Sequence, residues 1–216
     1  MSKLDKVLIT GSSKGLGKSL AQYFFENGHE VILHGRDETA LRETKHKISS
    51  EKYVDYYVCD LNNESEIFEL SKFAKSKEIN LLINNAGIQC ANKNFLDLEK
   101  KYIEDIINTN LKAPILLMHC MLSYINGVIN INSMSGIETK KFRTLYASTK
   151  WGLKGFSDCL KKENQEKNIL DVYPTNIKTS SKVKNGMELN YVTKSIYDSY
   201  YNNENELILD GRNENV

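Results

Sequence analysis

The sequence predicts an α/β fold in which one doubly wound parallel sheet carries helices on both faces. Short apolar runs alternate with helical patterns along the whole chain. Alternation on this scale implies right-handed crossovers between parallel strands. The chain has 216 residues and no evident linker, repeat or low-complexity segment. We therefore expect one domain over residues 1–216.

Each apolar run is interpreted as a strand and each periodic segment between two runs as a helix. The strands are expected at Val7–Thr10, Val31–His34, Tyr56–Cys59, Leu81–Asn84, Val128–Asn132, Leu170–Tyr173 and Leu207–Leu209. The helices are expected near residues 18–27, 38–50, 64–77, 99–125, 145–165 and 191–201. Ligands of such sheets bind at the carboxyl ends of the strands, near the point where the strand order reverses.

The stretch GSSKGLGKS, residues 11–19, lies between the first expected strand and the first expected helix. A Walker loop would need a glycine at position 12, which is Ser12, because Gly11 comes one place too early. The stretch instead fits Thr-Gly-x-x-x-Gly-x-Gly from Thr10 to Gly17. Backbone N–H groups and the helix dipole converge on an anion at such a turn, and glycines allow close approach of a pyrophosphate. The alternative is an ordinary tight strand–helix turn.

Composition excludes several function classes. The 29 basic and 28 acidic residues give a net charge of +1, which offers no footprint for nucleic acid or a membrane surface. No stretch has the apolar length of a membrane span, and Met1–Lys6 is too polar for a signal peptide. The four cysteines and four histidines are scattered. We therefore expect a cytoplasmic protein with reduced cysteines and no metal site.

The stretch INSMSGIETKKFRTLYASTKWG, residues 131–152, carries the chemistry. Tyr146 and Lys150 are one helical turn apart, so their side chains can point the same way. A phenol with a pKa of about 10 is a poor acid–base catalyst at neutral pH. A nearby ammonium stabilises the phenolate and lowers that pKa. Ser133, after a strand, can hydrogen-bond a reacting carbonyl. The alternative is a half-exposed tyrosine with a solvated lysine.

Together these motifs resemble the short-chain dehydrogenase/reductase family. TGSSKGLG, NNAG (residues 84–87), Ser133 and YASTK (residues 146–150) occur in the family's order and spacing, over about residues 6–180. The resemblance implies a Rossmann-type fold in which the glycine turn holds the pyrophosphate of NAD(P). A Walker B aspartate is also missing, because Asn84 and Asn85 end the strand LLIN.

The resemblance implies catalytic and cofactor-binding roles. Tyr146 would be the general acid/base, Lys150 would hold the nicotinamide ribose and lower the tyrosine pKa, and Ser133 would orient the substrate carbonyl. Asn110 resembles the fourth catalytic residue, whose backbone carbonyl holds a relay water, and Asp60 would meet the adenine. The implied cofactor-binding residues are Gly11, Ser13, Lys14, Gly15, Leu16, Gly17, Arg36, Asp60, Leu61, Asn85, Ala86, Gly87, Tyr146, Lys150, Pro174, Ile177 and Thr179.

A proline gives Asn110 a local physical reason for its role. Pro114 has no N–H to donate to the carbonyl of Asn110, four residues earlier in the expected helix 99–125. The helix should kink there, and the carbonyl should be available to a water. A proline kink that serves packing alone is the alternative, and the two are compatible.

The residues after the second expected strand predict NADP(H) rather than NAD(H). An NAD enzyme of this kind needs a carboxylate at that strand end, to bind the adenosine ribose. Gly35 fills the place here, followed by Arg36, whose planar fork suits a phosphate. Lys14 can add a second positive charge. In the alternative, Asp37 binds the ribose and Arg36 is a solvated surface residue.

Two features depart from the family pattern. Pro174 is followed by Thr175 where the family has glycine, so the nicotinamide-side loop is expected to be displaced, although Thr179 keeps the place of a carboxamide contact. Only about a dozen residues separate Thr179 from the helix near Tyr191, which is short for a substrate lid. The substrate is therefore left open between a ketoacyl thioester, a sugar-derived ketone and a small carbonyl compound.

The sequence thus predicts an NADP(H)-dependent oxidoreductase of the carbonyl reductase type that transfers a hydride between nicotinamide and a carbonyl/alcohol substrate. The alternative is a non-catalytic NADP-binding sensor or scaffold of the same fold. By resemblance we also expect a homodimer or homotetramer. Apolar residues of two helices are candidates for its interface, and the alternative is that all four belong to the monomer core: Leu117, Met121, Trp151 and Phe156.

Overall fold

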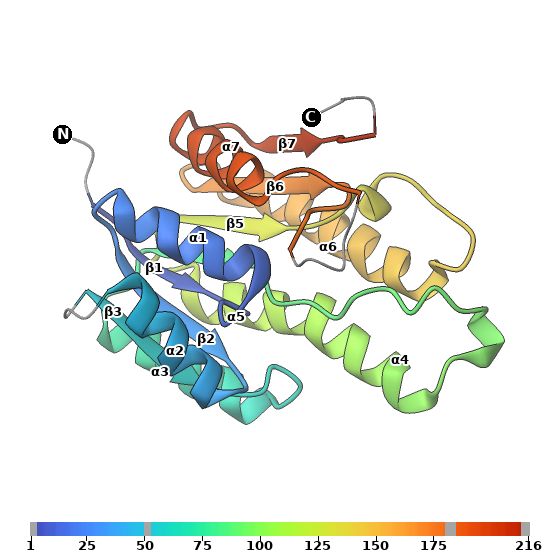
Figure 1. The fold of residues 1–216 in the computed structure, drawn as a ribbon, viewed down its shortest axis with the longest axis horizontal. Coiled ribbons are helices and arrows are strands. Elements are labelled where there is room, and N and C mark those ends of the chain that lie inside the picture. Colours follow the sequence, from blue (N-terminus) through green and yellow to red (C-terminus); the bar gives the residue numbers. More distant parts are fainter. Residues whose placement is uncertain (1–3, 50–52, 180–184, 213–216) are drawn as a thin grey trace.

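The computed structural model describes residues 4–49, 53–179 and 185–212 (Figure 1). Its sheet has seven strands in the order β3-β2-β1-β4-β5-β6-β7, and all neighbouring strands are parallel. The strands are β1 (Lys6–Ile9), β2 (Glu30–Gly35), β3 (Val54–Val58), β4 (Leu81–Asn84), β5 (Gly127–Ile131), β6 (Asn168–Pro174) and β7 (Glu206–Leu209). The order reverses between β1 and β4, which is where such folds bind ligands.

Helices cover both faces of the sheet (Figure 1). They are α1 (Gly15–Glu26), α2 (Glu38–Ile48), α3 (Glu64–Ser76), α4 (Lys100–Ile107), α5 (Ala113–Met121), α6 (Thr144–Glu163) and α7 (Leu189–Tyr201). Two single 3₁₀ turns, Phe95–Asp97 and Met134–Gly136, and a π-helical turn, Asn108–Lys112, complete the described elements. The predicted doubly wound α/β fold is confirmed.

Two hydrophobic cores hold the layers together. Alternation along β1 separates them, because Val7 and Ile9 face one core while Leu8 faces the other. The first core is closed by α1, α2 and α7, whose contributions include Phe24. The second is closed by α3, α5 and α6, with Met118 fully buried. Burial on both faces explains why the strands are continuous apolar runs in the sequence.

The expected helix over residues 99–125 is in fact three segments. A π-helical turn separates α4 from α5, and the backbone N–H of Ala113 donates to the carbonyl of Asn108, five residues earlier. Pro114 stands at the start of α5, where its missing N–H is tolerated. The irregularity that proline imposes is therefore taken up by one wider turn, which contains Asn110.

Two of the four residues expected at an oligomer interface belong to the monomer core. Leu117 and Met121 are fully buried in the core beneath α5, which corrects the prediction for both. Phe156 packs partly against the same core. Trp151 alone of the four is strongly exposed, at 45%. Periodicity showed that these helices are amphipathic, but did not show which apolar residues meet the sheet.

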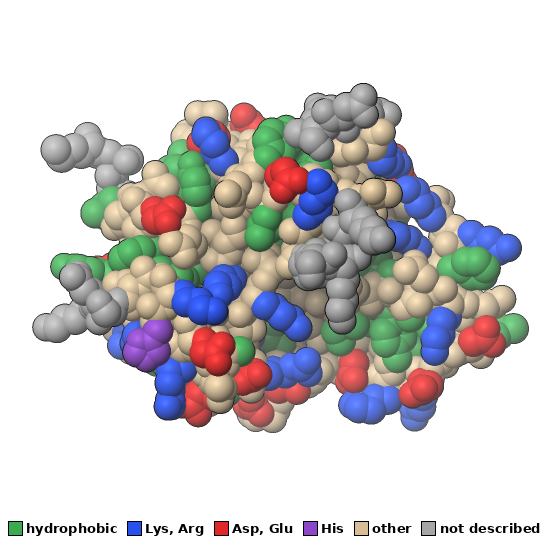
Figure 2. Space-filling model, in the orientation of Figure 1, with side chains coloured by type: hydrophobic (Ala, Val, Ile, Leu, Met, Phe, Trp, Pro, Cys, Tyr) green, Lys and Arg blue, Asp and Glu red, His purple; other side chains and the backbone are tan. Residues whose placement is uncertain are grey.

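Basic and acidic side chains are interspersed over the face drawn in Figure 2, in keeping with the net charge of +1. Within the described ranges, no helix has both the length and the apolar character needed to cross a membrane. Across the same ranges, no group of three or more histidine, cysteine, aspartate or glutamate side chains is arranged to hold a metal ion.

Candidate active site

The glycine turn after β1 and the NNAG segment after β4 form one interlocked unit. Gly11 has a φ of +65°, and a Cβ atom there would lie 2.9 Å from the Cα of Ala86. A Cβ atom on Gly17 would lie 2.4 Å from the Gly11 carbonyl oxygen. The Thr10 hydroxyl accepts the backbone N–H groups of Asn85 and Ala86, both at 3.0 Å. Larger residues in either glycine position would break this packing.

The turn ends in an open helix N-terminus. α1 begins at Gly15; Lys14, the residue before it, gives no side-chain cap, and no acidic residue lies in the first turn. The first N–H groups of a helix lack intrahelical partners and carry the positive end of its dipole. A phosphate group satisfies both. Ser13 and Leu16 anchor this turn, through a hydrogen bond from Thr44 to the Ser13 carbonyl at 3.0 Å and through burial of the Leu16 side chain.

Basic side chains lie at the carboxyl end of β2. Arg36 directly follows β2, is 68% exposed and places Nη1 3.8 Å from the Asp60 carboxylate. Lys14 is also exposed. Asp37, the alternative ribose ligand, instead caps α2 and accepts the N–H of Ala40 at 3.1 Å. One oxygen of this carboxylate is thus engaged by the helix, and the choice between Arg36 and Asp37 stays a prediction. Leu61 is buried beside this region.

The predicted catalytic residues meet at the ends of β5 and α6. Ser133 follows β5 and its hydroxyl accepts the N–H of Ser135 at 3.1 Å. Tyr146 and Lys150 lie on the first two turns of α6. Lys150 is 5% exposed, and its ammonium donates to the Ile131 carbonyl at 2.9 Å.

Asn110 supports the same site from the π-helical turn. Its side chain accepts the N–H of Ile88 at 2.7 Å and donates to the Ile88 carbonyl at 2.9 Å. Its side-chain Oδ1 would also lie 3.4 Å from a Cβ atom on Gly87. The pair of hydrogen bonds fixes the backbone that follows the NNAG segment. Asn110 thereby joins this backbone to the π-helical turn, which is in contact with α6.

The electrostatics differ from the prediction at Tyr146. Burial raises the pKa of Tyr146 above its ordinary value, although the Ser133 hydroxyl and the Arg143 guanidinium oppose this shift. Lys150 is not among the groups that lower the Tyr146 pKa in this structure, and its effect on the tyrosine stays a prediction. The Lys150 ammonium is bound to the Ile131 carbonyl and lies 5.9 Å from the centre of the Tyr146 ring. Burial also lowers the pKa of Lys150 to about 8.

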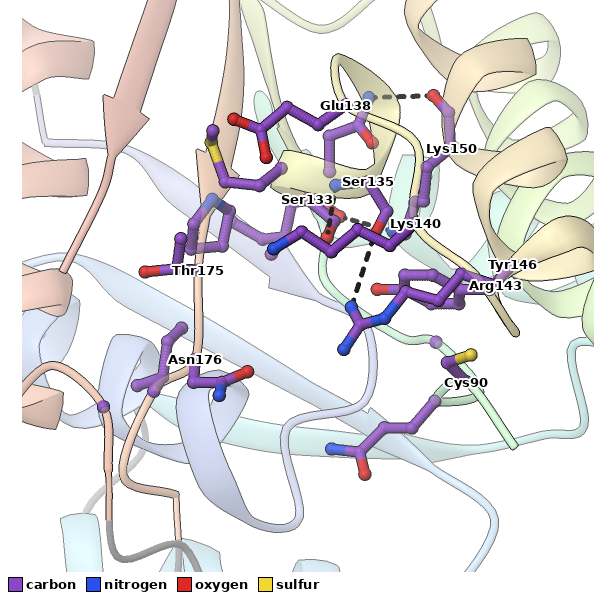
Figure 3. Close-up of a pocket in the computed structure, with 18 of the residues that line it drawn as sticks. Cys90, Ser133, Ser135, Glu138, Lys140, Arg143, Tyr146, Lys150, Thr175 and Asn176 are labelled. Atoms are coloured by element: carbon purple, nitrogen blue, oxygen red, sulfur yellow. Dashed lines mark hydrogen bonds between the residues drawn. The ribbon is translucent and has the colours of Figure 1, made fainter. Parts of the chain in front are cut away.

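A cavity of about 610 Å³ opens beside these residues (Figure 3). Ser133, Tyr146, Lys150 and Asn110 all line it. So do the predicted cofactor-binding residues Asn85, Gly87, Pro174, Ile177 and Thr179. The remaining predicted residues lie outside its lining, at the glycine turn and after β2, β3 and β4: Gly11, Ser13, Lys14, Gly15, Leu16, Gly17, Arg36, Asp60, Leu61 and Ala86.

The last described residues of the chain contribute to the wall of this cavity. The sequence motifs did not predict this contribution. Arg212 lines it and is bound to Glu138 through Nη1 at 2.7 Å and Nη2 at 2.8 Å. The Thr175 hydroxyl accepts the N–H of Gly211 at 3.0 Å, and the Thr175 N–H donates to the Leu209 carbonyl at 2.9 Å. Thr175 is not among the residues with positive φ, so it escapes the strain of a glycine-only conformation. We call residues 209–212 the C-terminal clasp.

A parallel sheet of this order, with a glycine turn beside its switch point, defines the class of dinucleotide-binding α/β proteins. A family model described as short chain dehydrogenase matches residues 5–189. The chain therefore belongs to the short-chain dehydrogenase/reductase family, and it is an oxidoreductase of that family. The resemblance found in its motifs is confirmed.

Known proteins similar to this chain agree with that assignment. An uncharacterized oxidoreductase of Staphylococcus saprophyticus is 32% identical over 169 residues, covering 74% of this chain and 72% of the relative. Carbonyl reductase family member 4 of Danio rerio is 28% identical and covers 78% and 72%. An alcohol dehydrogenase from Thermococcus sibiricus, solved with 5-hydroxy-NADP, shares the fold with a TM-score of 0.90, at 18% identity over 99% of both chains.

Proposed function

We propose that this protein is an NADP(H)-dependent oxidoreductase of the carbonyl reductase type, which transfers a hydride between the nicotinamide and a carbonyl or alcohol carbon. One observation carries the proposal: Ser133, Tyr146 and Lys150 line a single cavity together with the end of the NNAG segment. Likeness to a carbonyl reductase family member supports the same reaction class.

The residues present fit a dinucleotide. Glycines at positions 11 and 17 leave no room for a Cβ atom, and the uncapped start of α1 presents N–H groups to a pyrophosphate. Arg36 and Lys14 would hold the adenosine 2′-phosphate, while Lys150 and Thr179 would hold the nicotinamide half. When bound, the nicotinamide supplies or accepts the hydride.

The chain's own residues handle the proton. Burial keeps Tyr146 protonated at neutral pH, so its phenol is ready to donate to the oxygen of a carbonyl. The Ser133 hydroxyl orients that oxygen. Lys150 remains largely cationic at neutral pH and stabilises the phenolate left after donation. The protonated phenol is the form that carbonyl reduction requires, because that reaction consumes its proton.

Arg36 is the basis for preferring NADPH. Its guanidinium is exposed at the end of β2, and Asp37 is committed to capping α2. A phosphate on the ribose would meet a cation there rather than a free carboxylate. NADH lacks this phosphate and would lose the interaction.

The decisive experiment combines purified protein with NADPH and a panel of ketones, aldehydes and oxo acids, and follows the loss of reduced-cofactor absorbance. Tyr146→Phe should lower turnover by about 10²–10⁴-fold, since it removes the proton donor, while the ring still packs. NADP binding and thermal stability should remain close to wild type. A Phe variant that keeps most of the rate would refute the assignment. NADPH binding with no turnover of any carbonyl would favour the sensor alternative.

A homodimer or homotetramer is proposed as well. Trp151 on α6 and Ile107 on α4 are exposed apolar side chains, at 45% and 38%, and α4 and α6 are in contact. Large exposed apolar residues on two helices that are in contact favour a protein contact. Light scattering at micromolar concentration should give a multiple of the 24.7 kDa chain mass. A monomer mass would exclude the oligomer.

A further inference from the structure

Arg143 is a cation in the cavity wall that has no anionic partner within the described parts of the chain. Arg143 precedes α6 directly, three residues before Tyr146, and is partly buried. Figure 3 shows its guanidinium directed into the cavity and joined to Ser135, with Nη1 donating to the Ser135 hydroxyl at 3.3 Å. Among the residues that the structure describes, no carboxylate forms an ion pair with Arg143. A partly buried guanidinium with one neutral partner leaves donors free for a ligand.

The other charged residues of the cavity do not compete for this ligand site. Arg212 is held by both Glu138 and Asp210. Lys150 is directed to the Ile131 carbonyl. Glu138 is the one acidic side chain among the described residues of the lining, and Arg212 neutralises it. The cavity thus offers its positive charge through Arg143, and through Lys140, whose side chain is exposed at the rim.

Arg143 also lies close to the reacting centre. Ser135 bridges the two, because its N–H donates to Ser133 Oγ at 3.1 Å while its hydroxyl accepts from Arg143 at 3.3 Å. The guanidinium is near enough to Tyr146 to lower the pKa of the phenol. An anion on Arg143 would therefore belong to a group only a few bonds from the carbonyl held by Ser133 and Tyr146.

We propose that Arg143 binds a carboxylate of the substrate, so that the preferred substrates are short oxo acids and, in the reverse direction, the matching hydroxy acids. The inference rests on the proposed function. A carboxylate matches the planar fork of arginine with two parallel hydrogen bonds. In the reduction the carbonyl carbon gains a hydride with its electron pair, and the oxygen gains the proton of Tyr146. The two electrons come from NADPH, whose oxidation balances the reduction.

The kinetic test compares acetoacetate with its methyl ester, which keeps the ketone and removes the charge. We expect wild type to favour the acid in kcat/KM. Arg143→Gln should lower the acid-to-ester ratio about ten- to a hundredfold, the effect of charge-assisted hydrogen bonds worth roughly 1.5–3 kcal/mol. Arg143→Lys, which keeps a positive charge, should retain part of the acid-to-ester ratio. Lys141→Gln is the matched control: Lys141 is exposed outside the cavity lining, so the ratio should not change.

A binding measurement separates this inference from the proposed function. Butyrate, which cannot be reduced, is titrated calorimetrically into protein saturated with NADP⁺. Wild type and Lys141→Gln should bind it, and Arg143→Gln should lose at least tenfold in affinity. Equal butyrate affinity in wild type and Arg143→Gln, or a wild-type preference for the ester, overturns the carboxylate site. If no ketone, aldehyde or oxo acid of the panel is reduced, the proposed function fails, and the butyrate titration alone then decides whether Arg143 binds carboxylates.

Discussion

Acidification should destabilise this protein through one buried histidine. His34, near the end of β2, is 2% exposed. Its Nδ1 accepts the N–H of Gly11 at 3.3 Å, and its Nε2 lies 3.2 Å from the Cys59 sulfur. Burial lowers the pKa of His34 from 6.5 to about 4, although the hydrogen bond with Cys59 and the charge of Asp60 both raise it. His34 therefore stays neutral in the folded protein at pH values where it is protonated in the unfolded chain.

The direction and the size of the change in stability follow from the pKa values of His34 in the unfolded and folded states. Between pH 6.5 and about 4 the unfolded state binds more protons at this residue, so its contribution to stability is lost as the pH falls. From pH 7 to pH 5 the linkage relation gives a loss of about 2 kcal/mol from His34 alone. Burial also lowers the pKa of His29, which adds a loss of the same sign. Comparing the pH dependence of the unfolding free energy in a His34 variant and in wild type isolates the contribution of His34.

Urea denaturation at pH 7 and pH 5 measures the effect. His34→Asn keeps an acceptor near Gly11 but does not titrate in this range, so its free energy of unfolding should fall about 2 kcal/mol less than that of wild type between the two pH values. His46→Asn, on the exposed side of α2, is the control and should follow wild type. A His34→Asn variant with the full wild-type pH dependence would refute the reasoning.

The remaining predictions concern Arg36 at the end of β2 and two helical glycines, Gly17 and Gly155. Arg36→Leu should weaken NADPH binding about ten- to a hundredfold and NADH binding much less, so the ratio of kcat/KM for the two cofactors should fall; an unchanged ratio, or a wild-type preference for NADH, would count against Arg36. Gly17→Ala should cost about 1–3 kcal/mol of stability, because its Cβ would meet the Gly11 carbonyl. Gly155→Ala, which meets nothing within 4 Å on α6, should instead stabilise by up to about 1 kcal/mol, and thermal denaturation compares the two.

The sheet could be predicted because its strands are buried on both faces. β4 has the predicted bounds, Leu81–Asn84, and β1 differs by one residue at each end. The long helix could not be predicted in detail, since periodicity continues through a π-helical turn that adds one residue to the hydrogen-bonded ring. Pro114 marked the place of the irregularity but not its form.

The candidate site was predictable where short motifs hold its residues together, and not where distant segments meet. Tyr146 and Lys150 share one helix, so spacing alone placed them on neighbouring turns. The sign of the shift in the Tyr146 pKa depends on burial, which the sequence does not show. Arg143 could have been noticed beside Tyr146, but that no acidic residue of the described ranges pairs with it is a property of the folded chain. Arg212 and Glu138 are 74 residues apart in the sequence, and no local sequence pattern predicts their contact.

The C-terminal clasp completes the wall of the cavity with residues that come late in the sequence. The glycine turn and the NNAG segment that locks it both lie within the first 87 residues of the chain. The cavity beside Tyr146, in contrast, receives part of its wall from Gly211 and Arg212, which reach it only when β7 has joined β6 at the edge of the sheet. The residues of the glycine turn therefore all precede, by more than 100 positions, the residues that complete the cavity wall. Changes in the clasp should consequently alter which carbonyl compound fits, while the distant turn at Gly11 keeps its shape.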